Sequence, residues 1–201
     1  MLSRSIAIFL VALPLFSLSQ VRPRQQGLAD LLLEYFDARY PMYVPSPDML
    51  YVSVQRQRMY HVHDGRMQRE YIISTSVKGL GSVDGSQCTP EGLHRIAEKI
   101  GQGVPAGGLL QDRAFAGRFA DATRNEDQIT ARILWLEGME HGHNIGEGKD
   151  SYARAIYIHG TPFEDELGQP ASHGCIRMAD GDIIPLFDRV PVGTLVIILD
   201  N

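Results

Sequence analysis

Cysteine, tryptophan and runs of basic residues are scarce in this sequence. The chain has two cysteines and one tryptophan, and its 19 Lys and Arg residues are outnumbered by 24 Asp and Glu residues, for a net charge of −5. No segment is rich enough in Lys and Arg to form the positive surface of a nucleic-acid-binding protein, so we expect no nucleic-acid partner. We find no internal repeat and no low-complexity tract, and the composition is that of an ordinary globular protein.

Long apolar segments are also absent. Residues 6–16 are uncharged and mostly apolar, but they fall short of the ~20 residues that a membrane-spanning helix needs. Arg4 precedes them, and Ser17-Leu18-Ser19 follows with the small-x-small pattern of a cleavage site. These features predict an export signal over residues 1–19; a buried helix and an uncleaved anchor are the alternatives. We therefore expect a mature chain outside the cytoplasm, with no stable membrane span.

The rest of the chain is long enough for one domain with a substantial core. Apolar residues at helical spacing predict a short helix over residues 27–40. Three prolines in residues 41–49 predict an extended connector. We therefore divide the mature chain into a helical segment and linker at 20–47 and a single domain at 48–201.

Short strand patterns separated by turn signals fill this domain. They predict strands at 50–54, 58–62, 69–75, 131–136, 154–159 and 194–199. Asp64-Gly65 predicts a hairpin turn, residues 91–100 fit a strand or a short helix, and residues 182–189 fit a helix with Pro185 in its first turn. Many strands, few helices and no alternation of strand with helix predict a mostly β, antiparallel sandwich or barrel.

Three residues near the end of the chain suit nucleophilic chemistry: His159, His173 and Cys175. A free thiol is largely protonated at neutral pH, so a cysteine nucleophile needs a base or an imidazolium beside it. A histidine at the end of a strand can meet Cys175 if the loop over residues 161–171 folds back, and glycines and prolines at both ends of that loop favour such turns.

The residues around Cys175 also suit acyl transfer. Gly174 permits backbone conformations that other residues disfavour. The amides of Gly174 and Cys175 would then point at one oxygen atom, as an oxyanion hole requires. Ser172 would hydrogen-bond a histidine ring or the local backbone.

Two other interpretations stay open from the residues alone. A buried cysteine is more often an inert small hydrophobic residue than a nucleophile. A zinc site would use His159, His173 and Cys175 with His141 or His143 as the fourth ligand, although His-x-Cys is not a usual zinc spacing.

Cys88 and Cys175 would be able to form a disulfide in an oxidising compartment. We expect two free thiols instead, because an enzyme that depends on a thiolate cannot keep that sulfur oxidised. The remaining histidines of the strand region, His61 and His63, are expected to be solvated side chains rather than metal ligands.

Two sequence blocks resemble the catalytic signature of the L,D-transpeptidases (YkuD type). The segment Ile156–Pro162 (IYIHGTP) carries the histidine–glycine pair of that signature, and Ser172–Met178 (SHGCIRM) carries its Ser-His-Gly-Cys block. Upstream, Thr89–Ile96 (TPEGLHRI) is similar to the family's Thr-Pro-x-Gly-x-Phe-x-Ile block, with His94 at the Phe position. The resemblance covers roughly residues 48–200.

The resemblance implies a compact β sandwich or barrel that acts on peptidoglycan. Cys175 would attack the amide between the third and fourth residues of a stem tetrapeptide, and D-alanine would leave. His159 would be the general base, oriented by the carbonyl of Gly160. His173 would orient the site or contact substrate, and the amides of Gly174 and Cys175 would form the oxyanion hole.

Other residues gain expected roles from the same resemblance. Arg177 would bind a stem carboxylate or brace its loop, and Ser172 and Gly160 would lie at the substrate. The glycine-rich loop at 137–150 would serve as a lid. Trp135 would line the cleft or, as we favour, pack in the core. No cofactor is expected.

The acyl-enzyme would be resolved by a stem-peptide amine, by an amine-bearing protein or by water. Cross-linking of the 3–3 type or amine attachment is the leading hypothesis, and an L,D-carboxypeptidase or wall-peptide hydrolase is the alternative. A non-catalytic wall-binding module would lack a nucleophile or base, whereas both are present here. An exported enzyme of this kind would act in the periplasm or cell envelope.

Overall fold

Strands make up most of the regular structure in the computed structural model, which describes residues 27–119 and 128–201. The export signal predicted over residues 1–19 lies outside the described residues. The elements in chain order are α1 (Leu28–Arg39), β1 (Asp48–Ser53), β2 (Arg58–His63), β3 (Arg66–Ser74), β4 (Gly92–Ile100), β5 (Gly108–Gln111), β6 (Ala114–Arg118), β7 (Ile129–Gly138), β8 (Tyr157–Thr161), the 3-10 helix η2 (Glu164–Glu166), β9 (Ile176–Ala179), α2 (Asp180–Arg189) and β10 (Leu195–Leu199).

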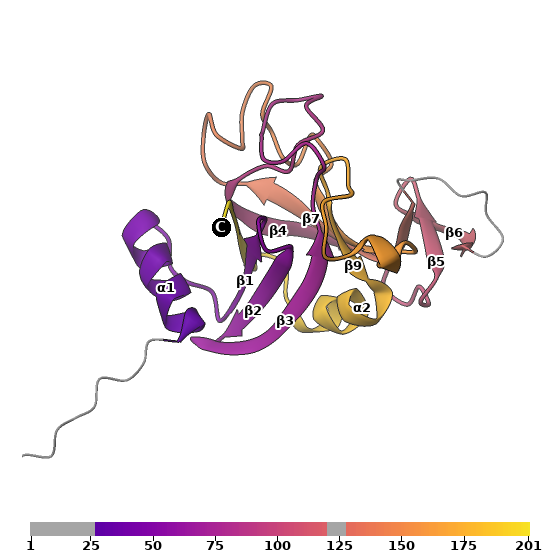
Figure 1. Ribbon diagram of the computed structural model, residues 1–201, viewed down its shortest axis with the longest axis horizontal. Helices are drawn as coiled ribbons and strands as arrows, with labels where there is room; N and C mark the ends of the chain where they lie inside the picture. Colours follow the sequence, from indigo (N-terminus) through magenta and orange to yellow (C-terminus); the bar gives the residue numbers. More distant parts are fainter. Residues whose placement is uncertain (1–26, 120–127) are drawn as a thin grey trace, which may run out of the picture.

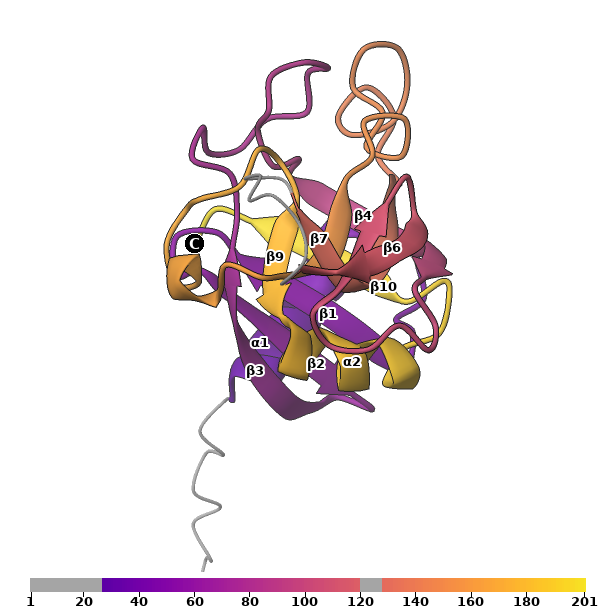
Figure 2. The ribbon, with the colours of Figure 1, turned by 90° about the vertical axis from the view of Figure 1, so that its right-hand side faces the viewer.

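One sheet closes on itself. Its strand order is β4-β10-β1-β2-β3-β9-β8-β7-β5-β6, and an additional pairing of β4 with β7 completes a barrel from which the β5–β6 hairpin extends (Figures 1 and 2). Neighbouring strands are antiparallel except for the pairs β1–β10 and β8–β9. The predicted mostly β, barrel-like fold with few helices is therefore confirmed.

The turn signals locate the first hairpin correctly. Asp64 and Gly65 both have positive φ, 46° and 70°, which is the conformation that a two-residue hairpin turn requires. They connect β2 to β3 as predicted. Residues 91–100, which fit either a strand or a helix by sequence, form β4, where they pair with both β7 and β10.

Strand β1 shows why the central strands are apolar on both faces. Successive side chains of a strand point to opposite faces. Leu50 and Val52 therefore enter the barrel core, whereas Met49 and Tyr51 enter a second cluster beneath α1. The helix predicted over residues 27–40 is confirmed, and it covers the outer face of the barrel through buried side chains such as Phe36.

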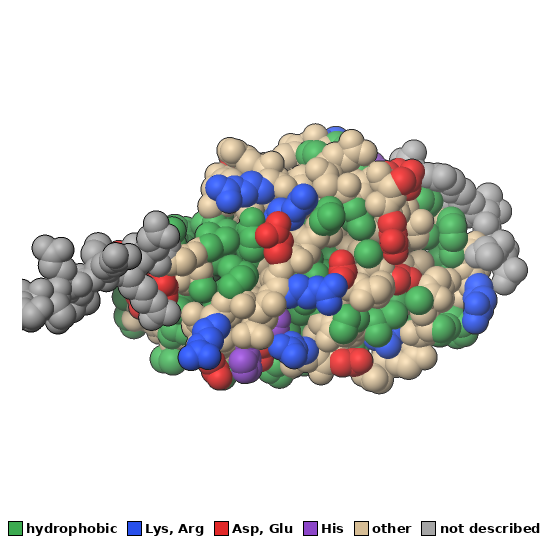
Figure 3. Space-filling model, turned by 60° about the horizontal axis from the view of Figure 1, so that its bottom comes forward, with side chains coloured by type: hydrophobic (Ala, Val, Ile, Leu, Met, Phe, Trp, Pro, Cys, Tyr) green, Lys and Arg blue, Asp and Glu red, His purple; other side chains and the backbone are tan. Residues whose placement is uncertain are grey.

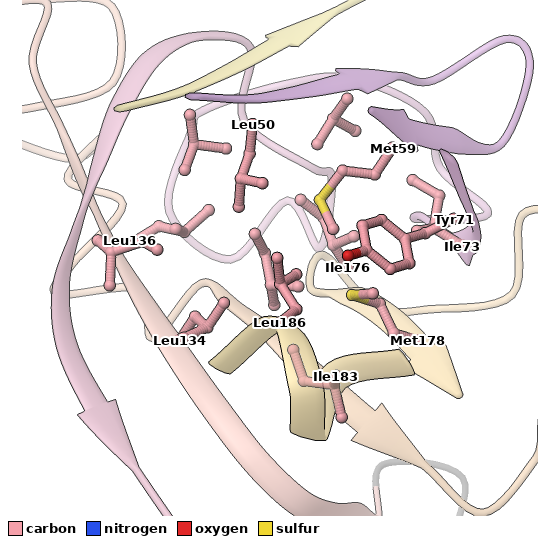
Figure 4. Close-up of a cluster of buried hydrophobic side chains, with 14 of the residues drawn as sticks. Leu50, Met59, Tyr71, Ile73, Leu134, Leu136, Ile176, Met178, Ile183 and Leu186 are labelled. Carbon is pink, nitrogen blue, oxygen red and sulfur yellow. The ribbon is translucent and has the colours of Figure 1, made fainter. Parts of the chain in front are cut away.

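Helix α2 fills the opposite side of the molecule from α1 and packs against β7 (Figure 1). Ile183 and Leu186 of this helix join Leu134 of β7 and Met178 of β9 in the barrel core (Figure 4). Each such fully buried side chain contributes about 1.5–3 kcal/mol relative to an exposed one, so α2 holds the ends of β7, β8 and β9 in place.

The start of α2 differs from the prediction. The sequence predicts a start at residue 182, but the helix begins at Asp180, immediately after β9, so that Pro185 lies beyond its first turn. The Asp180 carboxylate accepts hydrogen bonds from Thr130 Oγ1 (2.5 Å) and the Gly107 amide (2.7 Å). These long-range bonds fix the first residue of the helix, and the local pattern does not contain them.

The start of β8 also differs from the prediction. The sequence predicts a strand from residue 154, whereas β8 begins at Tyr157. Ala155 has a left-handed backbone (φ 54°), which departs from regular strand geometry, and its amide donates to the Tyr152 carbonyl in a turn. The turn places the residues before β8 beside the pocket described below.

Charged side chains are spread over the surface. On the face shown in Figure 3, basic and acidic side chains are interspersed, with hydrophobic side chains between them. Several surface charges are paired, such as Arg58 with Glu70 and Arg69 with Asp182. Exposed pairs of this kind contribute about 0–1 kcal/mol each, so the fold depends on its three apolar clusters.

The expectation that His61 is solvated is wrong. Its side chain is 1% exposed, and Asp48 Oδ1 lies 2.6 Å from His61 Nε2 and 2.9 Å from His63 Nδ1. Burial lowers the pKa of His61, against the opposing effect of Asp48. The error arises because β2 is covered on both faces, by the barrel core and by the cluster under α1.

His94 is also a core residue. It is fully buried in β4, where Nδ1 lies 3.0 Å from the Gly92 carbonyl oxygen and Nε2 lies 3.0 Å from Ser151 Oγ. Because a carbonyl only accepts, Nδ1 carries the proton and Nε2 accepts from the serine hydroxyl. Burial lowers the pKa of His94 to about 4, so the ring is neutral at pH 7.

This buried histidine predicts acid sensitivity. Unfolding returns the pKa of His94 from about 4 to its ordinary 6.5, so the unfolded state binds the extra proton first and stability falls as the pH drops through that window. We expect His94 to account for a loss of about 2 kcal/mol between pH 7 and pH 4.5. In urea unfolding, His94→Phe should be less stable at pH 7 but lose less stability on acidification. His141→Gln, at an exposed histidine, should keep the wild-type dependence; an equal acid loss in His94→Phe and wild type would contradict the assignment.

Candidate active site

Parallel pairing of β8 with β9 brings the two catalytic sequence blocks together. In this register Ile158 lies opposite Ile176 and His159 lies opposite Arg177. Cys175 immediately precedes β9, and the Tyr157 amide at the start of β8 donates to its Sγ at 3.4 Å. The loop between the strands therefore folds back as the sequence predicts.

A pocket of about 200 Å³ opens at these strand ends. It is lined by five residues that the sequence identifies, Cys175, His159, His173, Ser172 and Arg177, and by Ile129, Arg154, Ala155, Ile156 and Tyr157, which it does not. The structure thus gathers most of the predicted site around one half-buried thiol. Gly160 lies behind His159 in β8 instead of lining the pocket.

The thiol of Cys175 lies between a donor and an acceptor of the backbone. Its Sγ accepts from the Tyr157 amide and donates to the Ala155 carbonyl, each at 3.4 Å. Both partners belong to the segment that leads into β8. A thiolate at this position would keep the amide contact, so the pocket can support either protonation state.

His159 has a fixed ring orientation. It is 3% exposed, and its Nδ1 lies 2.8 Å from the Gly160 carbonyl oxygen. Because that oxygen can only accept, Nδ1 is the donor and Nε2 is the basic nitrogen of the neutral ring. His173 is exposed at the pocket instead. His159 is therefore a buried imidazole of the pocket with Nε2 as its basic nitrogen, and His173 is an exposed one.

Asp180 packs against the backbone that orients His159. A Cβ atom at Gly160 would overlap Asp180 Oδ1 and the Thr130 carbonyl, so only glycine fits there. Asp180 is itself held by Thr130 Oγ1 and the Gly107 amide, and burial raises its pKa. Sequence reasoning missed Asp180, because an aspartate in the first turn of a helix is an ordinary feature there.

Ser172 is expected from the sequence to hydrogen-bond either a histidine ring or the local backbone. In the structure it bonds to the backbone of the cysteine loop. Its hydroxyl donates to the Cys175 carbonyl (2.5 Å) and accepts from the Gly174 amide (3.3 Å). Gly174 has φ 125°, a conformation open to glycine, and its α-carbon faces the Cys88 carbonyl. The Gly174 amide therefore already has an acceptor in this state.

Arg177 braces the loop that connects the two strands. It is 3% exposed, and its guanidinium donates to Glu166 Oε2 of η2 at 2.9 Å. Of the two expected roles, binding a stem carboxylate and bracing the loop, this contact supports the second. Because Arg177 also lines the pocket, its rigid position fixes one wall beside Cys175.

Arg154 is a partly buried arginine that sequence reasoning missed. It donates to the carbonyls of Cys88 (2.8 Å) and Gly81 (3.2 Å) and lines the pocket. Burial lowers the pKa of Arg154, whereas Asp84, Cys88 and Cys175 act in the opposite direction. The guanidinium thus lies within electrostatic range of the thiol, a proximity that its place in the sequence does not reveal.

The remaining predictions concern the surroundings of the pocket. Trp135 is buried, donates to the Tyr152 carbonyl (3.0 Å) and stacks on the Tyr152 ring, so the favoured core role is confirmed. The lid role for residues 137–150 is not supported, because Glu140 accepts from the Leu93 amide and anchors this loop to β4. Residues 137–150 contribute no side chain to the pocket lining.

Both cysteines are free thiols. Within residues 27–119 and 128–201, no group of three or more His, Cys, Asp or Glu side chains is arranged to hold a metal ion. In the same residues, no helix is both long enough and apolar enough to cross a membrane.

The family model of the L,D-transpeptidase catalytic domain (YkuD) matches residues 47–198. The chain belongs to this family. The resemblance of the two sequence blocks around His159 and Cys175 is thereby confirmed. The L,D-transpeptidase match spans the whole barrel from β1 to β10, so the pocket at β8 and β9 lies inside it.

Individual relatives agree with the family assignment. YqjB, a candidate L,D-transpeptidase of Bacillus subtilis (strain 168), is 42% identical over 102 residues, which cover 48% of this chain and 57% of YqjB. ErfK/SrfK, a candidate L,D-transpeptidase of Escherichia coli (strain K12), is 51% identical over 48 residues, which cover 24% of this chain and 16% of that protein. The matched part is therefore less than two thirds of either relative.

A solved structure supports the fold. The crystal structure of L,D-transpeptidase 3 from Mycobacterium tuberculosis in complex with a faropenem-derived adduct has a TM-score of 0.50 and 16% identity, over 77% of this chain and 60% of that one. At this identity the likeness concerns the fold.

The close contact at Gly160 yields a stability prediction. We expect Gly160→Ala to lower the free energy of unfolding by about 1–3 kcal/mol, because the added methyl group must displace Asp180 or Thr130. Gly181→Ala is the matched control, since a Cβ atom there meets open space, and it should be neutral or slightly stabilising. Urea unfolding of both variants checks this; equal midpoints for Gly160→Ala and wild type would contradict the packing.

Proposed function

We propose that this chain is an exported cysteine L,D-transpeptidase that acts on peptidoglycan stem tetrapeptides. The observation that carries the proposal is the pairing of β8 with β9, which places Cys175 and a histidine of fixed tautomer, His159, in one pocket. Membership of the family supports the reaction class. The domain would comprise residues 48–201, preceded by the helical segment at 20–47 and the signal at 1–19.

Acylation would begin with proton transfer from the Cys175 thiol to Nε2 of His159. The sulfur then attacks the carbonyl carbon of the third stem residue. The C–N bond to the fourth residue breaks, and the imidazolium returns its proton to the leaving amine, so that D-alanine departs and a thioester remains. The hydrogen bond from His159 Nδ1 to the Gly160 carbonyl keeps the ring oriented while it carries charge.

The amides of Gly174 and Cys175 would stabilise the tetrahedral oxyanion. The Gly174 amide now donates to Ser172 Oγ at 3.3 Å, which is longer than an ordinary N–H···O bond. A developing negative charge is the stronger acceptor, so the amide would exchange the hydroxyl for the oxyanion. Ser172 would keep its bond to the Cys175 carbonyl and hold the loop.

Three further residues would support the chemistry. Arg154, which lines the pocket, would stabilise the thiolate by its positive charge. Arg177 would keep its own wall of the pocket rigid through its ion pair with Glu166. His173, exposed at the pocket, would contact substrate rather than accept the thiol proton.

The acceptor determines the product. An amine of another stem would give a 3–3 cross-link, a protein amine would give an attached protein, and water would give the tripeptide of an L,D-carboxypeptidase. The same Cys175 and His159 serve all three. Mass spectrometry of products from disaccharide-tetrapeptide, with and without added amine, distinguishes them, and an absence of any turnover would contradict the proposal. The chemistry would take place in the periplasm or cell envelope.

The proposed roles of the two histidines differ in a measurable way. Cys175→Ser should abolish the acyl-enzyme seen by intact-protein mass spectrometry with stem tetrapeptides. His159→Ala should slow acylation by about 10²–10⁴-fold, the usual contribution of a general base, and His173→Ala should slow it much less. His141→Ala, at an exposed histidine outside the pocket, should match wild type. A greater loss in His173→Ala than in His159→Ala would identify His173 as the base.

The charge of Arg154 should govern the reactivity of the thiol. Arg154→Met should slow alkylation of Cys175 by iodoacetamide at pH 7 several-fold, because the thiolate loses a neighbouring cation. Arg154→Lys retains the charge and should retain most of the rate. Peptide mapping separates Cys175 from Cys88, and Arg66→Met, at an exposed arginine of the β2–β3 hairpin, serves as the control. Equal losses for the Met and Lys variants would show that the guanidinium acts only by holding the loop.

A further inference from the structure

The tip of the β5–β6 hairpin has an unusual composition. Asp112 and Arg113 connect the two strands with φ of 48° and 66°, so two residues that carry side chains occupy the left-handed conformation that glycine favours. A two-residue hairpin turn requires positive φ at both positions, where asparagine, aspartate and glycine are the usual residues, so an arginine there is uncommon. The conformation directs attention to what Arg113 contacts.

Arg113 lies against two aromatic side chains, Trp135 and Tyr157, and the second of these lines the pocket. Its guanidinium carbon lies 4.9 Å from the centroid of the Trp135 ring, and its guanidinium interacts with the Tyr157 hydroxyl. Trp135 is fixed in turn by stacking on Tyr152 (4.3 Å, 8°) and by an edge contact with Tyr157 (5.2 Å, 87°). The result is a rigid cation–aromatic platform.

Tyr157 connects this platform to the nucleophile. It lines the pocket, and its amide donates to Cys175 Sγ while its hydroxyl faces Arg113. Burial raises the pKa of the Tyr157 hydroxyl, and Arg113 opposes that shift, as a positive charge beside the ring must. Arg113 and Cys175 thus contact the same residue, Arg113 at the side-chain hydroxyl of Tyr157 and Cys175 at its backbone amide.

Arg113 lacks an acidic partner among residues 27–119 and 128–201. Glu98, a carboxylate that acts electrostatically on Tyr157, accepts a hydrogen bond from the Tyr152 hydroxyl. A stacked guanidinium keeps its in-plane N–H groups available, and their fork matches the two oxygens of a carboxylate. The platform therefore presents a guanidinium without a carboxylate partner among the described residues, next to a tyrosine that lines the pocket.

We propose that Arg113 is a specificity-determining residue that binds a carboxylate of the acyl-donor peptide. This inference rests on the proposed function, because the donor it concerns is the stem tetrapeptide. Two carboxylates of that peptide share the chemistry: the terminal carboxylate of the leaving D-alanine, and the side-chain carboxylate of the third residue when that residue is diaminopimelate. Arg113 positions the donor and takes no part in bond cleavage.

The test compares three peptides: the diaminopimelate tetrapeptide, its C-terminal carboxamide, and the tetrapeptide with lysine at the third position. With the first, Arg113→Gln should raise KM about tenfold and leave kcat nearly unchanged, which is the loss of one charge-assisted contact. Arg113→Lys should fall between. Arg118→Gln, in β6 of the same hairpin, should match wild type.

The other two peptides identify the carboxylate. For wild type, KM should be about tenfold higher with the peptide that lacks the recognised carboxylate than with the first peptide. With that same peptide, Arg113→Gln and wild type should have equal KM values. If the KM of wild type rises only with the carboxamide, Arg113 binds the terminal carboxylate. If it rises only with the lysine peptide, Arg113 binds the side-chain carboxylate of the third residue. Equal losses for Arg113→Gln with all three peptides, or no loss with any, would overturn the inference.

A binding measurement separates this inference from the proposed function. Trp135 is the only tryptophan of the chain, so its fluorescence should report occupation of the platform. In Cys175→Ser, the first peptide should bind with a fluorescence change, and the added Arg113→Gln substitution should weaken that binding about tenfold. Wild type that binds in this way without turning over any peptide would contradict the proposed function alone. Wild-type turnover with an unchanged dissociation constant in Arg113→Gln would contradict the inference alone.

Discussion

The parallel pairing of β8 with β9 is the constraint on which the site depends. The two catalytic blocks are separated by a loop, and only their register sets Cys175 beside the Tyr157 amide and His159 opposite Arg177. A shift of one residue would move every side chain of β9 to the other face. That shift is resisted because Ile176 and Met178 are fully buried in the barrel core, with α2 packed beneath them. The hydrophobic core therefore determines the geometry of the nucleophile.

Around this pair of strands, polar contacts to the backbone do the finer positioning. Asp180 confines Gly160, Ser172 ties the cysteine loop, and Arg154 joins the pocket to the Cys88 segment. Each contact is buried or partly buried, so losing one partner leaves a polar group unsatisfied. The ring of His159 is oriented by the Gly160 carbonyl, and Gly160 is packed so closely against Asp180 and Thr130 that it has no space for a side chain.

The sequence predicts the parts of this arrangement that are encoded locally. Alternation and turn residues give the barrel-like fold and the Asp64-Gly65 hairpin, and the two blocks give His159, His173 and Cys175. Arg154 and Asp180 escaped prediction because their importance comes from contacts with residues distant in sequence, Cys88 and Gly107. His61 was misjudged for the same reason, since α1 and the barrel core bury β2 from opposite faces. Local sequence patterns predict secondary structure and motifs, whereas the roles of these residues depend on their contacts with distant segments in the closed barrel.

In the closed barrel, the residues proposed for the reaction and the residue proposed for substrate recognition lie on different strands. The proposed base lies in β8 and the proposed nucleophile immediately precedes β9, and the core enforces the register of these two strands. The β5–β6 hairpin pairs only with β7 and contributes no side chain to the main barrel core, although Leu110 of β5 packs with Trp135 and Tyr157 in a smaller cluster beside Cys175. Tyr157 and Trp135 connect the two parts. The Tyr157 amide contacts the thiol, and Arg113 contacts both the Tyr157 hydroxyl and the Trp135 ring. A change of donor would therefore require substitutions at the hairpin tip, whereas a change of reaction would require substitutions inside the barrel.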